Sequence, residues 1–287
     1  MDIRMEFVRK KQNTELLEQE KNGVRYLQFP AFSETGVCRH LFSTRIGGVS
    51  TGDLGTMNLS YSRGDKKENV DENFRRIAEV LDSDVKNFVL SQQTHTTNVR
   101  VVTNEDRGKG VIEELDYTDV DGLVTNETGI VLSTFYADCV PLFFLDPVKK
   151  VIGLSHSGWR GTVNKMGKVT VDTMVKEYGC NRADILAAIG PSICVDCYEV
   201  SRDVADAFAE AFMGADNLDK IVRPKSEEKA MLDLWQANYA VFLEAGIEPE
   251  HITLPDICTA CNKELLFSHR ASNGKRGNLG AFLMLEP

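Results

Sequence analysis

The sequence lacks the features that mark a chain for export, for a membrane or for nucleic acid. Residues 1–23 are charged throughout and have no apolar core of the kind found in a signal peptide. The longest apolar runs, such as residues 140–145, are far shorter than the roughly 20 residues that cross a bilayer. The 33 basic residues are outnumbered by 43 acidic ones, and no dense basic run is present to neutralise a phosphate backbone. We therefore expect a cytoplasmic protein with no membrane segment and no nucleic-acid partner.

Sequence repeats, low-complexity segments and Pro/Gly/Ser-rich linkers are also absent. The chain has 287 residues, of which 42% are hydrophobic, and this is enough to bury a sizeable core. A single domain over residues 1–287 is the simplest interpretation.

Apolar, β-branched segments alternate with helical patterns along the chain. The expected strands are 24–29, 37–42, 88–91, 99–103, 122–125, 130–134, 151–155 and 185–189. The expected helices are 67–81, 161–178, 201–212 and 234–245, and Ser201 is a candidate N-cap for the third. Because the strands between residues 88 and 155 are separated by little helix, we expect antiparallel hairpins there. The fold class predicted is α+β, with mixed sheets flanked by helices.

Histidine is scarce, and two of the five histidines follow predicted strands. These are His95 and His156, and Cys139 lies between them in the sequence beside an apolar stretch. Two imidazoles and one thiolate are suitable zinc ligands, and three protein ligands leave a fourth position for water or substrate. The long spacing is weak support for such a site. From the residues alone, a strand-capping His95 and a small buried Cys139 are the more common outcome.

The seven cysteines offer a second metal site. An odd number in an unexported chain favours free thiols, and four of them form two C-x-x-C pairs, Cys194 with Cys197 and Cys258 with Cys261. Four thiolates can close a structural zinc site. However, the segment between the pairs far exceeds the roughly 15 to 20 residues of a zinc ribbon, so the sequence argues against this site. A disulfide-exchange motif is less favoured still, because residues 191–198 do not begin a helix after a strand.

Arginines are the natural candidates for binding phosphate, because the guanidinium group matches phosphate oxygens in pairs. Arg45 precedes Gly47 and Gly48, and Arg160 neighbours Gly158 and Gly161. Their position at glycine-containing turns favours both over Arg270 and Arg276. Trp159 has the ring to stack on a purine, although core packing explains it equally well.

Taken together, these segments resemble the YfiH family, also called the laccase-domain or multicopper polyphenol oxidase-like family. The matching motifs run in order from about residue 42 to residue 285. They are FSTRIGGVS at 42–50, QQTH at 92–95, DGLVT at 121–125, ADCVPLFFLDP at 137–147, SHSGWRGT at 155–162, GPSIC at 190–194, CYEV at 197–200 and FSHR at 267–270.

The resemblance implies a zinc site formed by His95, Cys139 and His156, and a one-domain α+β fold related to bacterial cysteine hydrolase toxins. It also implies phosphorolysis of adenosine, inosine, guanosine and methylthioadenosine, together with deamination of adenosine. Arg45 would contact substrate or phosphate. One departure lies near the end of the chain, where family members often carry Tyr-Arg-Arg and this sequence has His269-Arg270-Ala271.

Three alternatives stay open at this point. Relatives are also associated with hydrolysis of a peptidoglycan-precursor amide, in which zinc or the Cys139 thiolate would attack a carbonyl. Copper accepts ligands similar to those of zinc, but five histidines are too few for a multicopper oxidase. The non-enzymatic alternative is an interaction protein stabilised by zinc at the two C-x-x-C pairs.

Overall fold

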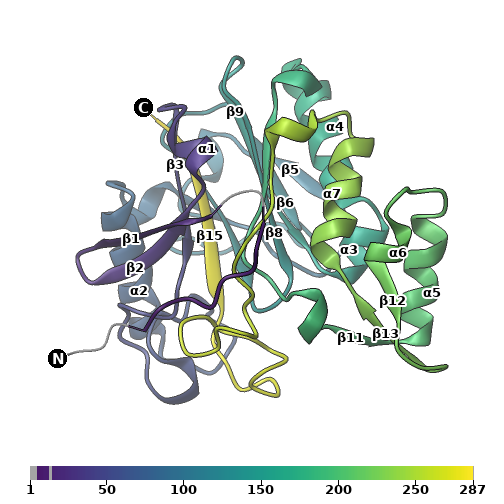
Figure 1. Cartoon of the computed structure of the whole chain (residues 1–287). Coiled ribbons are helices and arrows are strands. Elements are labelled where there is room, and N and C mark those ends of the chain that lie inside the picture. The colour runs from purple at the N-terminus through teal and green to yellow at the C-terminus, as the bar shows by residue number, and fades with distance from the viewer. Residues whose placement is uncertain (1–4, 13–14, 287) are drawn as a thin grey trace.

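A computed structural model describes residues 5–12 and 15–286. The fold has two six-stranded sheets packed face to face, with helices on both outer sides (Figure 1). A small three-stranded sheet and two further helices lie at one flank. Within the described residues, no helix combines the length and the apolar composition that crossing a membrane would require.

The first large sheet has the strand order β1-β2-β3-β15-β7-β4. Its strands are β1 (Leu17–Lys21), β2 (Val24–Gln28), β3 (Cys38–Ser43), β15 (Leu279–Leu285), β7 (Val131–Tyr136) and β4 (Phe88–Leu90). All neighbours are antiparallel except β4 and β7, which are parallel. The helix α2 (Lys67–Val80) covers the outer face, where its Phe74 and Ile77 join a core cluster with Phe282 of β15.

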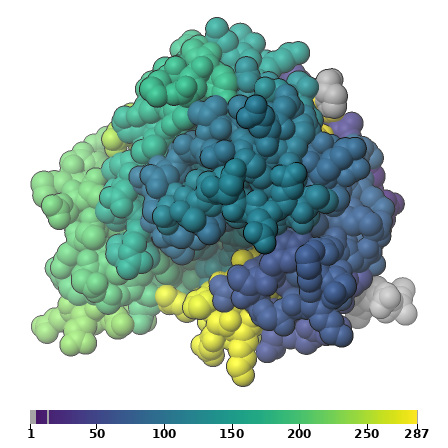
Figure 2. All heavy atoms as spheres, turned by 180° about the vertical axis from the view of Figure 1, so that it is seen from behind, coloured from purple at the N-terminus to yellow at the C-terminus, as the bar shows by residue number. Residues whose placement is uncertain are grey.

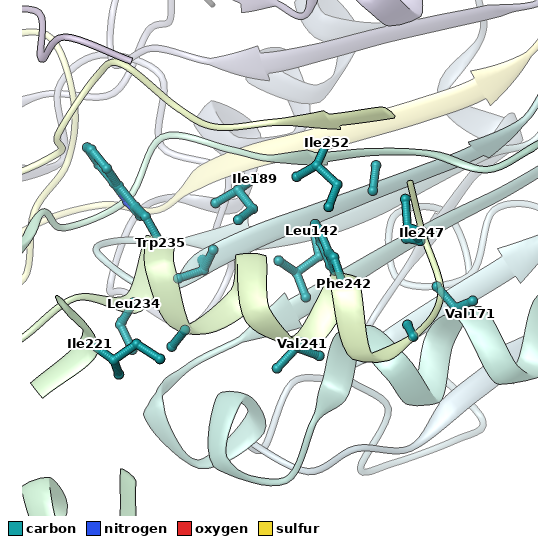
Figure 3. Packing of buried hydrophobic residues seen from close by; sticks show 14 of the residues in the cluster. Leu142, Val171, Ile189, Ile221, Leu234, Trp235, Val241, Phe242, Ile247 and Ile252 are labelled. Atoms are coloured by element: carbon teal, nitrogen blue, oxygen red, sulfur yellow. The ribbon is translucent and has the colours of Figure 1, made fainter. Parts of the chain in front are cut away.

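The second large sheet has the order β14-β10-β8-β9-β6-β5. Its strands are β14 (Ile252–Thr253), β10 (Leu186–Ile189), β8 (Val140–Asp146), β9 (Val151–Ser157), β6 (Gly122–Thr125) and β5 (Val99–Val101). The helices α4 (Met166–Tyr178) and α7 (Leu234–Glu244) cover its outer face. Figure 3 shows Val241 and Phe242 of α7 in the cluster that also contains Leu142 of β8 and Ile189 of β10.

The flanking unit and the short elements complete the fold. The small sheet pairs β11 (Glu199–Ser201), β13 (Lys229–Leu232) and β12 (Val222–Pro224) beside α5 (Arg202–Ala211) and α6 (Leu218–Ile221). Two short helices are α1 (Pro30–Ser33) and α3 (Trp159–Val163). The 3₁₀ helices are Gly52–Leu54, Val85–Asn87, Asn104–Asp106, Arg182–Asp184, Val195–Cys197 and Pro249–His251.

The centre of the core lies between the two large sheets. Along β8, Leu142 and Phe144 pack toward the helices, whereas Phe143 and Leu145 belong to the cluster between the sheets. Both faces of β8 are therefore buried, and the strand is apolar at nearly every position, as is usual for strands covered on two sides. Such a strand has no alternating pattern, and for this reason neither β8 nor β15 was among the predicted strands.

The mixed sheets and helices predicted from the sequence are confirmed, with three corrections. The predicted helix over 161–178 is two helices, α3 and α4, because Lys165 adopts a left-handed conformation (φ 60°). The hairpin expectation holds for β8 and β9, but β5 pairs with β6 in parallel. Ser201 lies at the N-cap of α5 but makes no capping hydrogen bond through its side chain. The likeness to cysteine hydrolase toxins stays a prediction.

Candidate active site

The three predicted metal ligands come together although they are far apart in the sequence. Cys139 immediately precedes β8, and His156 lies in β9, where it is paired with Pro141 of β8. His95 lies in the loop after β4, in a left-handed conformation (φ 67°). One ligand atom from each residue lies within 4.8 Å of the others. The two imidazole rings meet nearly edge to face, with centroids 4.9 Å apart. β9 (Val151–Ser157) runs two residues further than the predicted strand, and His156 is its penultimate residue.

Asp121 orients the His156 ring and holds the backbone of the turn that carries His95. Its Oδ1 lies 2.8 Å from Nδ1 of His156, so Nε2 of that ring is the nitrogen left for a ligand. The carboxylate also accepts the backbone N–H groups of Thr94, His95 and Thr96, at 3.0, 3.1 and 2.9 Å. Burial raises the pKa of Asp121, but these hydrogen bonds outweigh it and hold the pKa below its usual value. A buried carboxylate thus holds the His95 turn and His156 in one arrangement.

The charges of Cys139 and His156 support one another. Burial would raise the pKa of the Cys139 thiol, but the adjacent imidazoles, His156 first, lower it well below the usual value. Burial would lower the pKa of His156, but Cys139 and Asp121 raise it. The thiolate form of Cys139 is therefore favoured, and a thiolate is the form that binds metal.

Gly158 leaves room for His95 and Cys139 to lie close together. A Cβ atom at that position would lie 2.8 Å from Cδ2 of His95 and 3.3 Å from Sγ of Cys139. Any larger residue would therefore push against two of the three candidate ligands.

Two adjoining cavities open onto the cluster, and both are lined by His95, Cys139, Arg63 and Arg276. The first, of about 360 Å³, has aromatic and apolar side chains in its lining, namely Trp159, Ile193, Tyr198 and Leu234. The second, of about 340 Å³, is more polar and is lined by serine, glutamine and asparagine side chains. Figure 2 shows the surface hollowed where the C-terminal residues, in yellow, adjoin the blue and teal segments. A larger cavity of about 630 Å³ beside α5 contains neither candidate metal cluster.

The structure places the two predicted arginines differently. Arg160 lines the first cavity, with its guanidinium 4.4 Å from the centre of the Trp159 ring. Arg45 lines neither cavity at the cluster. Its guanidinium donates to the carbonyl oxygens of Gly55 and Lys263, at 2.8 and 2.9 Å. A contact between Arg45 and the substrate stays a prediction.

Two other arginines face the cluster. Arg276 lines both cavities and has a buried Nε with no hydrogen-bond partner in the described structure. Burial, and next the positive charge of Arg63, lower the pKa of Arg276 to about 10. Two positive charges brought together beside a cavity form a typical anion-binding arrangement.

The C-terminal loop forms part of the same wall, although its motif departs from the family pattern. His269 and Arg270 both line the first cavity. The backbone N–H of Arg270 donates to Oδ2 of Asp138 at 2.7 Å, and Oγ1 of Thr259 donates to Oδ1 at 2.6 Å. Both oxygens of Asp138 therefore accept hydrogen bonds within the protein. Asp138 therefore anchors the loop.

Asp121 and Arg63 were not among the candidate residues, and Arg276 was ranked below Arg45 and Arg160. Asp121 lies in the DGLVT motif, and an aspartate directly before a strand was the available signal. Arg63 and Arg276 have no local signal, because their place at the cavities depends on long-range packing.

Comparisons with known proteins agree with this architecture. The chain is 37% identical to purine nucleoside phosphorylase YlmD of Bacillus subtilis over 243 residues, covering 84% of this chain and 86% of that protein. It is 37% identical to adenosine deaminase RL5 of an unknown prokaryote over 195 residues, covering 68% and 73%. The crystal structure of hypothetical protein YfiH from Bacillus licheniformis superposes with a TM-score of 0.87 at 30% identity, covering 94% of this chain and 99% of that one. A family model described as multi-copper polyphenol oxidoreductase laccase matches residues 39–286, and the chain therefore belongs to this laccase-like YfiH family.

Proposed function

We propose that this protein is a zinc-dependent purine nucleoside phosphorylase with adenosine deaminase activity. Its substrates would be adenosine, inosine, guanosine, methylthioadenosine and inorganic phosphate. The observation that carries the proposal is the convergence of His95, Cys139 and His156 where two cavities meet. The similarity to a purine nucleoside phosphorylase and to an adenosine deaminase supports the reaction class.

The donor set fits zinc. Two imidazole nitrogens and a sulfur in its thiolate form are ligands that zinc prefers, and their mutual separation of at most 4.8 Å suits one ion. The Asp121 carboxylate, hydrogen-bonded to His156, is the kind of outer partner that a metal-binding histidine usually has. A bound zinc ion would supply Lewis acidity beside the substrate.

The arginine pair supports a phosphate position. Phosphate held by Arg63 and Arg276 would lie at the boundary of the two cavities, next to Cys139. In phosphorolysis, a phosphate oxygen bonds to the ribose anomeric carbon while the bond to the purine nitrogen breaks. The bonding electrons leave with the purine, which takes up a proton. Guanidinium groups hold the attacking dianion in place, and positioning of this kind supplies much of the rate.

The first cavity suits the purine. Trp159 and Tyr198 offer aromatic surfaces there, and Ile193 and Leu234 offer apolar ones. The more polar second cavity suits the ribose hydroxyls. Because the cluster borders both cavities, a nucleoside in a second orientation would bring the purine amino group toward it. Two binding poses at one site would then serve phosphorolysis and deamination.

Copper-dependent phenol oxidation, which the family description names, is less well supported. A multicopper centre needs many histidines, and the sequence has five. In the described residues, the only candidate metal cluster with histidine is the one at Cys139, and it has two.

The test is phosphate-dependent release of free base from adenosine and inosine by protein of known metal content. We expect release by the wild type with phosphate present, and loss of both bound zinc at this site and activity in Cys139→Ala. Cys38→Ala, a buried cysteine remote from the cavities, is the matched control and should retain activity. A zinc-loaded wild type that is inert toward all four nucleosides would contradict the proposal.

A further inference from the structure

The two C-x-x-C pairs, which the sequence argues against as one metal site, meet in the folded chain. The parallel strands β10 and β14 are adjacent, with Ala187 opposite Ile252. Each strand leads within a few residues to one C-x-x-C pair, so both pairs emerge at the same end of the sheet. A further parallel bridge joins Ser192 to Cys258. The long gap in the sequence is thus spanned by the flanking sheet, α5, α6 and α7, and does not separate the pairs in space.

The four sulfur atoms have the spacing of a metal site. One sulfur from each of Cys194, Cys197, Cys258 and Cys261 lies within 4.8 Å of the others. Four sulfurs around a zinc ion, at about 2.3 Å each, are separated by about 3.8 Å from one another. The sulfurs of Cys197 and Cys261 are 3.6 Å apart. A disulfide requires about 2.05 Å, so the arrangement matches a tetrahedron of thiolates better than two bonded pairs.

Backbone N–H groups and a lysine lie close to the four sulfurs. Cys258 is fully buried, and its Sγ lies 3.2 Å from the backbone nitrogen of Cys194 and 3.5 Å from that of Cys261. Both N–H groups point at one sulfur, which is a weak acceptor as a thiol and a stronger one as a thiolate. Lys10 interacts electrostatically with Cys194 and Cys261 and pairs with Asp196 at 3.0 Å. A cation bound among the four sulfurs would neutralise them as thiolates in this buried setting.

We propose that Cys194, Cys197, Cys258 and Cys261 bind one zinc ion in a closed structural site, separate from the cluster at Cys139. Four protein sulfurs fill the tetrahedron and leave no position for substrate. No group transfer or redox step is part of this assignment.

The contacts around this tetrathiolate site give it a role in shaping the active-site cavity. Thr259 follows Cys258 and donates to Asp138, the residue before Cys139. Tyr198 follows Cys197 and lines the cavity, and Arg270 donates to the carbonyl oxygen of Cys197. Zinc at the four cysteines would therefore hold two separate parts of the cavity wall together. These are positioning effects, since none of the four cysteines lines the cavity.

The test counts metal in the full-length protein, purified under reducing conditions and with zinc added during expression. We compare the wild type with Cys139→Ala, with Cys197→Ser/Cys261→Ser, and with the control Cys38→Ser/Cys180→Ser, which alters two buried cysteines outside both clusters. We expect two zinc ions per chain in the wild type and in the control. Each of the other two variants should keep one. The proposal is wrong if the zinc content of Cys139→Ala is zero, or if Cys197→Ser/Cys261→Ser loses none.

A second measurement decides the matter if the cluster variant does not fold. Cys139→Ala leaves all four cluster cysteines in place, and it is loaded with cobalt(II) instead of zinc. Strong thiolate-to-cobalt charge-transfer and tetrahedral d–d absorption bands are expected. Mass-spectrometric thiol labelling of the zinc form should find the four cysteines protected until a chelator is added. Bound iron, or disulfides that resist labelling after chelation, would overturn the zinc assignment. These readouts do not use nucleoside activity, so they are independent of the function proposed above.

Discussion

Asp121 and His156 are joined twice, once through their side chains and once through the backbone. Oδ1 of Asp121 lies 2.8 Å from Nδ1 of His156, and the backbone N–H of His156 donates to the carbonyl oxygen of Asp121 at 2.7 Å. Since the same carboxylate accepts three backbone N–H groups of the His95 turn, one buried side chain sets the positions of two candidate metal ligands.

Replacing this carboxylate should weaken metal binding. In Asp121→Asn, the amide nitrogen would face either Nδ1 of His156 or the N–H groups of the turn, and neither arrangement satisfies all partners. We expect zinc affinity at the Cys139 cluster to fall by about 10- to 100-fold, as for other outer-shell partners of metal-binding histidines. Competition with a chromophoric chelator measures this zinc affinity. Asp116→Asn, an exposed carboxylate paired with Lys109, is the control. Equal affinity in wild type and Asp121→Asn would remove Asp121 from this role.

Gly158 allows a test of the site that spares the fold. Its φ of −73° suits any residue, so Gly158→Ala adds no backbone strain, but its Cβ would press on His95 and Cys139. We expect reduced zinc occupancy and at least a tenfold loss of activity, with a melting temperature of the metal-free protein close to that of the wild type. Gly161→Ala is the matched control, because its Cβ would meet only ordinary contacts beginning at 3.5 Å. Full zinc occupancy in both variants would contradict this prediction, because it would show that the crowding at Gly158 does not weaken metal binding.

The fold was predictable to the extent that local patterns encode it. The strands β2, β3 and β6 and the helix α2 have the expected periodicity or composition. The central strands β8 and β15 do not, because burial on both faces removes the alternation that identifies a strand. Which strands pair, and in which direction, depends on long-range contacts that no local window contains.

The candidate site shows the same limit. His95, Cys139 and His156 were identified through a family resemblance, because their spacing alone gives little information. The four-cysteine cluster was discounted because the gap between its pairs is long. Only the parallel pairing of β10 and β14 shows that such a gap can be closed. Spacing rules for metal sites apply to small domains in which both ligand pairs belong to one local motif.

The two candidate phosphate sites, at Arg63 and Arg276 or at Arg45, lead to different kinetic predictions. If Arg63 and Arg276 hold phosphate, Arg63→Gln should raise the phosphate KM by about 10-fold or more, which corresponds to a lost charged hydrogen bond of roughly 1.5–3 kcal/mol. Its effect on kcat and on the nucleoside KM should be smaller. Arg45→Gln is the comparison, since that guanidinium is held by two backbone carbonyls away from the cluster. Steady-state kinetics at varied phosphate concentration, measured for both variants, decide between the two sites. A raised phosphate KM in Arg45→Gln alone would favour the sequence-based assignment.

His40 should make the stability of the protein depend on pH. It is buried among Phe29, Phe32 and Phe143, and its Nε2 accepts the backbone N–H of Phe29 at 2.8 Å. Burial lowers the pKa of His40 to about 3, against 6.5 in its ordinary state. Below pH 6.5 the unfolded chain therefore binds a proton that the folded chain does not, and the stability contributed by neutral His40 is lost as the pH falls toward 3.

We expect this to lower the free energy of unfolding by about 2–3 kcal/mol between pH 6.5 and pH 4.5, at roughly 1.4 kcal/mol per pH unit. His40→Gln retains a side-chain acceptor for Phe29 but does not titrate. Its free energy of unfolding should therefore decline less steeply than that of the wild type, and the difference between the two proteins should narrow as the pH falls. Urea denaturation at several pH values measures both curves. Parallel curves for wild type and His40→Gln would show that another group, and not His40, governs the acid sensitivity of the fold.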